Sequence, residues 1–128
     1  MKTIKFLTSG ILVCFALSVQ SQNLSSDITA GFKAGNVNLI SKYFAKCVDV
    51  SILDVNKACS ITEAENELSK FIQANPPKDF TPIHSGERAG SSYVIGKLTT
   101  GTGEFRITCY AKKTETGYII NQLKVEKF

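Results

Sequence analysis

The strongest constraint on the fold is a strict alternation of apolar and polar residues from Glu104 to Lys113. Successive side chains of a strand point to opposite faces, so one face of this segment carries Phe105, Ile107, Cys109 and Ala111. Runs typical of strands flank it, Tyr93–Thr100 before and Tyr118–Glu126 after, and short Gly-containing segments join the three. This pattern predicts an antiparallel meander with one buried face, which the preceding part of the chain must cover.

The N-terminus has the pattern of an export signal. Lys2 and Lys5 precede the apolar run Ile11–Leu17, an arrangement typical of signal peptides. The alternative, a membrane anchor, needs about 20 apolar residues, and this run is shorter. We therefore predict that residues 1–22 are a cleaved signal peptide, that the protein is exported to the periplasm or beyond the cell, and that no membrane anchor remains.

Residues 23–128 have the length of one domain. Removing Lys2 and Lys5 lowers the formal net charge of +4 by two units, and so weak a charge does not indicate nucleic-acid binding. The three remaining cysteines, Cys47, Cys59 and Cys109, and the single histidine do not have the spacing of zinc ligands, so we expect no metal and no cofactor. Cys109 is expected in the core. One disulfide, none, or an oligomer linked through Cys47 or Cys59 all remain open.

Three helices are expected before the meander. The first, Leu24–Ala34, has an apolar stripe and ends at Gly35, and the second is capped by Asn36 and runs through Phe44. The third runs from a capping box at Thr62 and Glu65 to Ala74, where Asn75-Pro76-Pro77 stops it. Its buried stripe is expected to be Ala64, Leu68, Phe71 and Ile72.

Three further strand segments complete the pattern. Val48–Asp54 is expected to turn at Val55–Lys57 into a short strand at Ala58–Ser60, and Asp79–Arg88 is expected to begin the meander. Pro82 places that last strand at an edge or a bulge. The order of elements predicts one α+β domain.

Several short motifs are spread over nearly all of the chain after residue 22: Ile28, Ala34-Gly35-Asn36, Tyr43-Phe44, Ser51-Ile52-Leu53-Asp54, Asn75-Pro76-Pro77, Phe80, Ile83-His84-Ser85-Gly86, Tyr93–Thr100 and Gly103–Arg106. In these residues the chain resembles a family of small exported bacterial proteins, domain of unknown function four-seven-eight-three, within the nuclear-transport-factor-two-like superfamily. That superfamily includes ketosteroid isomerase and scytalone dehydratase. The resemblance implies a cone-shaped α+β fold, with N-terminal helices and a curved, mainly antiparallel sheet wrapping one long helix. It also implies a pocket at the wide end and, often, dimers formed through the outer sheet surface.

Two groups of residues are candidates for a site. Tyr43, His84 and Asn121 could line a pocket: a lone histidine can titrate near neutral pH, and a buried asparagine needs hydrogen-bond partners. Two of them also have a structural interpretation: His84 as a surface or packing residue, and Asn121 as a residue at a bulge or one satisfied by nearby backbone groups. No catalytic residue is assigned.

The outer sheet surface is the second candidate. It is expected to carry Tyr93, Ile95, Arg106, Tyr110 and Ile120, and aromatic residues with arginine are typical of contact patches. Two functions follow. The first is a non-catalytic binding or protein-interaction module of the periplasm or cell envelope, dimeric through this surface, with an unknown small molecule or envelope protein as its other possible partner. The alternative is a small-molecule-binding or isomerase- or dehydratase-like enzyme that uses the pocket of the cone.

Overall fold

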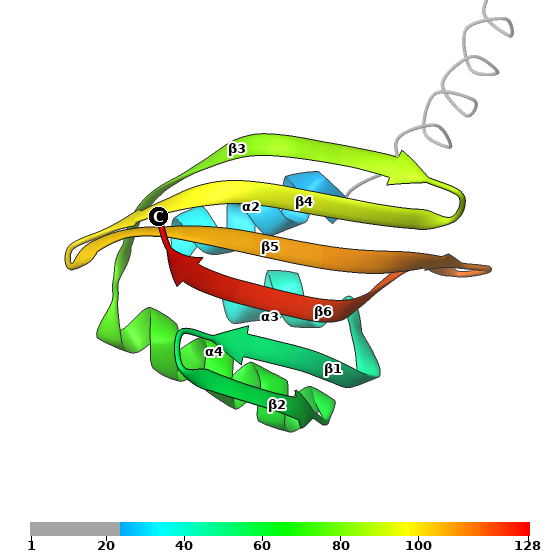
Figure 1. Cartoon of the computed structure of the whole chain (residues 1–128), viewed down its shortest axis with the longest axis horizontal. Helices are drawn as coiled ribbons and strands as arrows, with labels where there is room; N and C mark the ends of the chain where they lie inside the picture. The colour runs from blue at the N-terminus through cyan, green and yellow to red at the C-terminus, as the bar shows by residue number, and fades with distance from the viewer. Residues whose placement is uncertain (1–23) are drawn as a thin grey trace, which may run out of the picture.

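The computed structural model describes residues 24–128, and the signal peptide predicted for residues 1–22 lies outside this range. Three helices lie on one face of a six-stranded curved sheet (Figure 1). The other face of the sheet, here called the outer face, is turned away from the helices. None of the helices in residues 24–128 is both long enough and apolar enough to cross a membrane.

The first two helices form a compact corner. α2 (Leu24–Ala34) buries Leu24, Ile28 and Phe32, as its stripe predicts, and Gly35 follows it with a φ of 68°. α3 (Val37–Ser41) is capped by Asn36 as predicted but is shorter than expected. The expected extension through Phe44 is wrong because Phe44 begins β1, and the Ile120 amide donates to the Tyr43 carbonyl. Pairing with a distant strand overrides the local helical pattern.

The third helix, α4 (Ile61–Ala74), begins two residues earlier than predicted. Ser60 caps it: its hydroxyl accepts from the Glu63 amide at 3.2 Å, and the Glu63 carboxylate accepts from the Ser60 amide at 2.9 Å. Ser60–Glu63 and Thr62–Glu65 both have capping-box spacing, and the structure uses the first because β2 ends at Cys59. The predicted stripe is confirmed: Ala64, Leu68, Phe71 and Ile72 are buried.

The sheet has the strand order β2-β1-β6-β5-β4-β3, in which only β1 and β6 are parallel. The predicted meander is confirmed. The strands are β1 (Phe44–Ile52), β2 (Val55–Cys59), β3 (Pro77–Arg88), β4 (Ser91–Thr100), β5 (Gly103–Thr114) and β6 (Gly117–Lys127). The sequence did not predict that β6 pairs with β1, which joins the meander to the first hairpin.

The hairpin of β1 and β2 turns at Leu53–Asp54, because Ile52 pairs directly with Val55. The turn predicted at Val55–Lys57 is therefore wrong. Leu53 has a φ of 53° and is 41% exposed. A leucine in this left-handed conformation is unfavourable, and two-residue hairpins usually place Asn or Gly there. Leu53 therefore does not indicate a turn from its residue type.

Two bulges change which residues face the helices. In β3, Pro82 pairs with Gly96 and His84 pairs with Ile95, so one residue is extra; this confirms the edge or bulge predicted from Pro82. In β6, Gln122 pairs with Tyr110 but Ile120 pairs with Ala111, so Asn121 is extra. Ile120 was expected on the outer face and is instead fully buried, because the bulge reverses the alternation before it.

The space between α4 and the sheet is filled by side chains. Leu68, Phe71, Phe105 and Ile107 are buried, and the rings of Phe71 and Phe105 meet edge to face at 5.0 Å between centroids. Cys109 is buried as predicted and Cys59 is buried too, whereas Cys47 is exposed. All three are free thiols, so of the two cysteines considered for a linked oligomer only Cys47 is accessible.

Candidate functional site

An aromatic patch lies on the outer face over β3, β4 and β5. Tyr93 pairs with Tyr110, and His84 pairs with Ile95 beside them. The rings of His84 and Tyr93 lie 5.3 Å apart between centroids. Tyr110 is 44% exposed, and Tyr93 and Ile95 are half-buried. These four residues, His84, Tyr93, Ile95 and Tyr110, form a continuous surface that no helix covers, and we call it the aromatic patch.

Two cations border the aromatic patch. Lys97 and Arg106 pair across β4 and β5, and both lie over the ring of Phe128, at 5.5 Å and 5.4 Å from its centroid. Phe128 itself is 56% exposed. Lys97 also contacts Glu104 at 3.5 Å. The border of the aromatic patch therefore combines two positive charges with the exposed ring of Phe128. The quadrupole of an aromatic ring attracts a cation that lies over its face.

A polar depression of about 480 Å³ lies on the other half of the outer face, over β2, β1 and β6. Its lining residues are Asp49, Val50, Ser51, Asn56, Lys57, Ala58, Gln122 and Lys124. Asp49 lies between Ala58 of β2 and Gln122 of β6, and Ser51 lies between Asn56 and Lys124. The surface is hollow here because Ala58 and Ser51 are small while the residues around them are longer.

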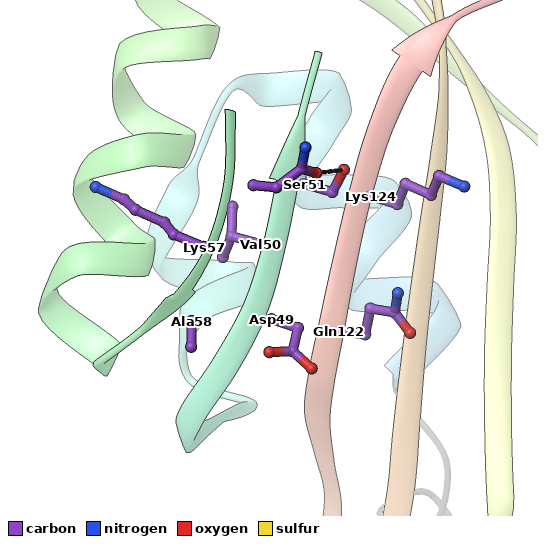
Figure 2. Close-up of a pocket in the computed structure, with 8 residues that line it drawn as sticks. Asp49, Val50, Ser51, Lys57, Ala58, Gln122 and Lys124 are labelled. Carbon is purple, nitrogen blue, oxygen red and sulfur yellow. Dashed lines mark hydrogen bonds between the residues drawn. The ribbon is translucent and has the colours of Figure 1, made fainter. Parts of the chain in front are cut away.

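The charged residues of the depression differ in whether they form ion pairs. Lys57 points toward α4 (Figure 2) and contacts the Glu67 carboxylate at 3.0 Å, which lowers the pKa of Glu67. Within residues 24–128, Asp49 has no ion-pair partner, and the only acidic contact of Lys124 is Glu126, at 3.9 Å. The Ser51 hydroxyl donates to the Asn56 side-chain oxygen at 2.5 Å. Asp49, Gln122 and Lys124 project from the face opposite α4 (Figure 2).

The three residues predicted to line a pocket do not come together. The Tyr43 hydroxyl donates to Asp27 at 2.6 Å, and burial together with this hydrogen bond raises the pKa of Tyr43. His84 is exposed on the edge strand β3, and Asn121 is at the bulge of β6. Two strands separate β3 from β6, which corresponds to roughly 14 Å. The three residues therefore do not line one common pocket.

Of the residues expected on the outer surface, four lie there and one does not. Tyr93, Ile95, Arg106 and Tyr110 share the outer face, and Ile120 is in the core. Within residues 24–128, no group of three His, Cys, Asp or Glu side chains is placed to hold a metal ion. Sequence reasoning missed the depression because it depends on the parallel pairing of β1 with β6. The small outward residues Ser51 and Ala58 were its one visible signal.

Comparison with known proteins identifies the family and the fold. The profile described as "Domain of unknown function (DUF4783)" matches residues 25–126. A crystal structure of a DUF4783 family protein from Bacteroides ovatus ATCC 8483 is 30% identical, with a TM-score of 0.79 over 84% of this chain and 98% of that one. Another, from Bacteroides fragilis YCH46, is 32% identical, with a TM-score of 0.75 over 80% of this chain and 96% of that one.

More distant structures share the fold alone. A protein named "Rd1NTF2_04 with long sheet" is 12% identical, with a TM-score of 0.68 over 83% of this chain and 99% of that one, in agreement with the α+β fold that the resemblance implied. No curated protein matches the chain significantly. The profile match over nearly all of residues 24–128, together with the two Bacteroides relatives, shows that the chain belongs to the DUF4783 family, a family of unknown function.

Proposed function

We propose that the chain is a non-catalytic interaction module, exported to the periplasm or beyond the cell, and that it forms a homodimer through the aromatic patch. The observation that carries the proposal is the uncovered cluster of Tyr93, Ile95 and Tyr110 on the outer face. Contiguous exposed apolar surface of this kind marks interaction sites, and tyrosine and arginine are enriched in them.

A second copy of the chain fits this surface because the surface complements itself. A two-fold dimer brings the same patch of both protomers together, so the patch must offer groups that attract each other. Lys97 and Arg106 supply cations, and Tyr93 and Tyr110, four residues away along the same two strands, supply rings. The two cations already contact an aromatic ring within the protomer, that of Phe128. Rotation by a two-fold axis would place such cations against the partner's tyrosine rings.

The enzyme alternative lacks comparable support. A site in the cone would need a space between α4 and the sheet, where Leu68, Phe71, Phe105 and Ile107 are packed. It would also need its polar groups within reach of one another, and Tyr43, His84 and Asn121 lie on separate parts of the fold. The packed interior and the uncovered exterior both favour a function at the surface.

Sedimentation velocity of residues 23–128 over a range of concentrations tests the dimer. We expect a concentration-dependent dimer, and we expect Tyr110→Glu to weaken it by at least about tenfold because a charge would be buried at the contact. Gln73→Glu is the matched control, since it adds the same charge at an exposed position of α4. A wild-type protein that stays monomeric at every concentration, or equal weakening by the two substitutions, would refute the proposal.

Export needs its own measurement because it rests on residues 1–22 alone. Expression of the full chain in a bacterial host, followed by fractionation and intact-mass measurement, should yield a protein shortened by about 22 residues outside the cytoplasm. Full-length protein retained in the cytoplasm would contradict the prediction. Neither result bears on the dimer, so the two parts of the proposal stand or fall separately.

A further inference from the structure

We infer that the polar depression over β2, β1 and β6 binds a small zwitterion, a free amino acid or short peptide, with its ammonium group at Asp49 and its carboxylate at Lys124. The inference does not rest on the dimer, since the depression lies beside the aromatic patch and its lining residues belong to other strands. It rests on the volume of the depression, on its lining groups and on two opposite charges: within residues 24–128, Asp49 has no ion-pair partner and Lys124 has only the 3.9 Å contact with Glu126.

The depression has the size and polarity of a site for a small polar molecule. Its volume of about 480 Å³ is within the range of ligand sites, roughly 300 to 1,000 Å³. Ala58 contributes only a methyl group to the outer face, and the other lining side chains on that face are polar. Val50 is buried and faces the helices. An apolar ligand would leave these polar groups without partners, which is unfavourable.

The charges select a zwitterion over other polar ligands. Asp49 pairs directly with Gln122, and Lys124 is two residues further along the parallel strand β6. The usual strand spacing and rise per residue place the Cα atoms of Asp49 and Lys124 roughly 8 Å apart on the same face. An anion such as phosphate would be attracted by Lys124 and repelled by Asp49. A metal cation would be attracted by Asp49 and repelled by Lys124. A molecule with both charges can form a charge-assisted hydrogen bond at each end.

The neutral groups between the charges suit an amide or amine compound. The Gln122 side chain both donates and accepts, so it can bind either the N–H or the C=O of a peptide bond. The Ser51 hydroxyl donates to the Asn56 side-chain oxygen, and within residues 24–128 the side-chain amide nitrogen of Asn56 has no hydrogen-bond acceptor, so it can donate to a ligand. The lining therefore offers both donors and acceptors beside the two charged residues.

Titration of ¹⁵N-labelled residues 23–128 with alanylalanine, followed by amide chemical shifts, tests the inference. We expect saturable shifts at Asp49, Ser51, Gln122 and Lys124, with millimolar affinity because the depression is open. N-acetyl-alanylalanine lacks the ammonium group, and alanylalanine amide lacks the carboxylate. Each should bind about tenfold more weakly, the equivalent of one lost charge-assisted hydrogen bond.

Substitutions separate this site from non-specific binding. Asp49→Asn and Lys124→Gln should each weaken alanylalanine by about tenfold, while Lys112→Gln, the same charge change on an exposed part of the outer face, should leave it unchanged. The spectra of the variants also report whether each is folded. No saturable shift, equal binding of the three probes, or shifts confined to other residues would overturn the inference. Stronger binding of glucose or inorganic phosphate at the same residues would do so too.

Discussion

Gly96 is the residue on which the packing of β4 depends most directly. It faces the helices, and a Cβ atom added there would fall within the ring of Phe80, which is buried and stacks on Phe32 at 5.3 Å between centroids. The ring occupies the space that any other residue would fill. Glycine is thus required at position 96 because the Phe80 ring lies close to its Cα atom. Its backbone angles do not require glycine, because its φ is not positive.

Gly96→Ala should therefore lower the free energy of unfolding by about 1 to 3 kcal/mol, the usual cost of overpacking a core. Gly101→Ala is the control: nothing lies within 4 Å of the added Cβ, and the φ of Gly101 is not positive either. Urea denaturation measures both variants. If Gly96→Ala is no less stable than Gly101→Ala, Phe80 does not occupy this space in solution.

Single residues also explain why parts of the site could not be predicted. The period-two pattern correctly placed Tyr93, Ile95, Arg106 and Tyr110 on the outer face, because β4 and β5 pair without a break. It failed for Ile120, because one extra residue, Asn121, shifts the register of β6. Nothing in the pattern of β6 alone distinguishes a bulge from a regular strand, since the extra residue is defined by the partner strand.

At the scale of elements, a charged hydrogen-bond cluster ties α2 to the residues that enter β1. The Asp27 carboxylate accepts from the Tyr43 hydroxyl at 2.6 Å and contacts Lys42 at 2.9 Å. The hydrogen bond from Tyr43, and to a smaller extent the contact with Lys42, hold the pKa of Asp27 below its usual range. The hydrogen bond of Tyr43 thus joins α2 to the residue that precedes β1.

The cluster predicts a pH dependence of stability. The pKa of Asp27 is lower in the folded state than in the unfolded state. The contacts of its carboxylate therefore contribute fully to the free energy of unfolding above the unfolded-state pKa of about 3.9. This contribution is lost as the pH falls through the folded-state pKa. Asp27→Asn should cost about 1 kcal/mol of unfolding free energy near neutral pH and much less at about pH 3.

The control for this prediction is Asp49→Asn, since Asp49 has no ion-pair partner within residues 24–128. Urea denaturation of both variants and the wild type at the two pH values measures the differences. A cost of Asp27→Asn that stays the same at both pH values would show that the hydrogen bond does not depend on the charge of Asp27.

The elements were predicted best where local signals agree. The end of α4 at Asn75-Pro76-Pro77 and its buried stripe came from the sequence, because prolines and helical spacing act locally. The start of α4 was misplaced because two capping boxes overlap, and only the position of β2 decides between them. The end of α3 was misplaced because Phe44 pairs with Ile120, 76 positions further along the chain. A local pattern does not reveal so distant a partner.

At the scale of the whole molecule, the sheet has one covered face and one uncovered face (Figure 1). The helices cover the inner face, which is why we propose the outer face as the binding surface, with the aromatic patch on one half and the polar depression on the other. The order of strands was the part of the fold that the sequence left open, because the β1–β6 pairing joins segments far apart in the chain. That pairing creates the depression.

The most direct test of the surface account is an isotope-filtered NOE experiment on a mixture of labelled and unlabelled residues 23–128. The account predicts contacts between the Tyr110 ring of one protomer and the Ile95 or Tyr93 side chain of its partner, and their loss in Tyr110→Glu. Intermolecular contacts that involve only α4 or the β2 edge, with none to the aromatic patch, would contradict it.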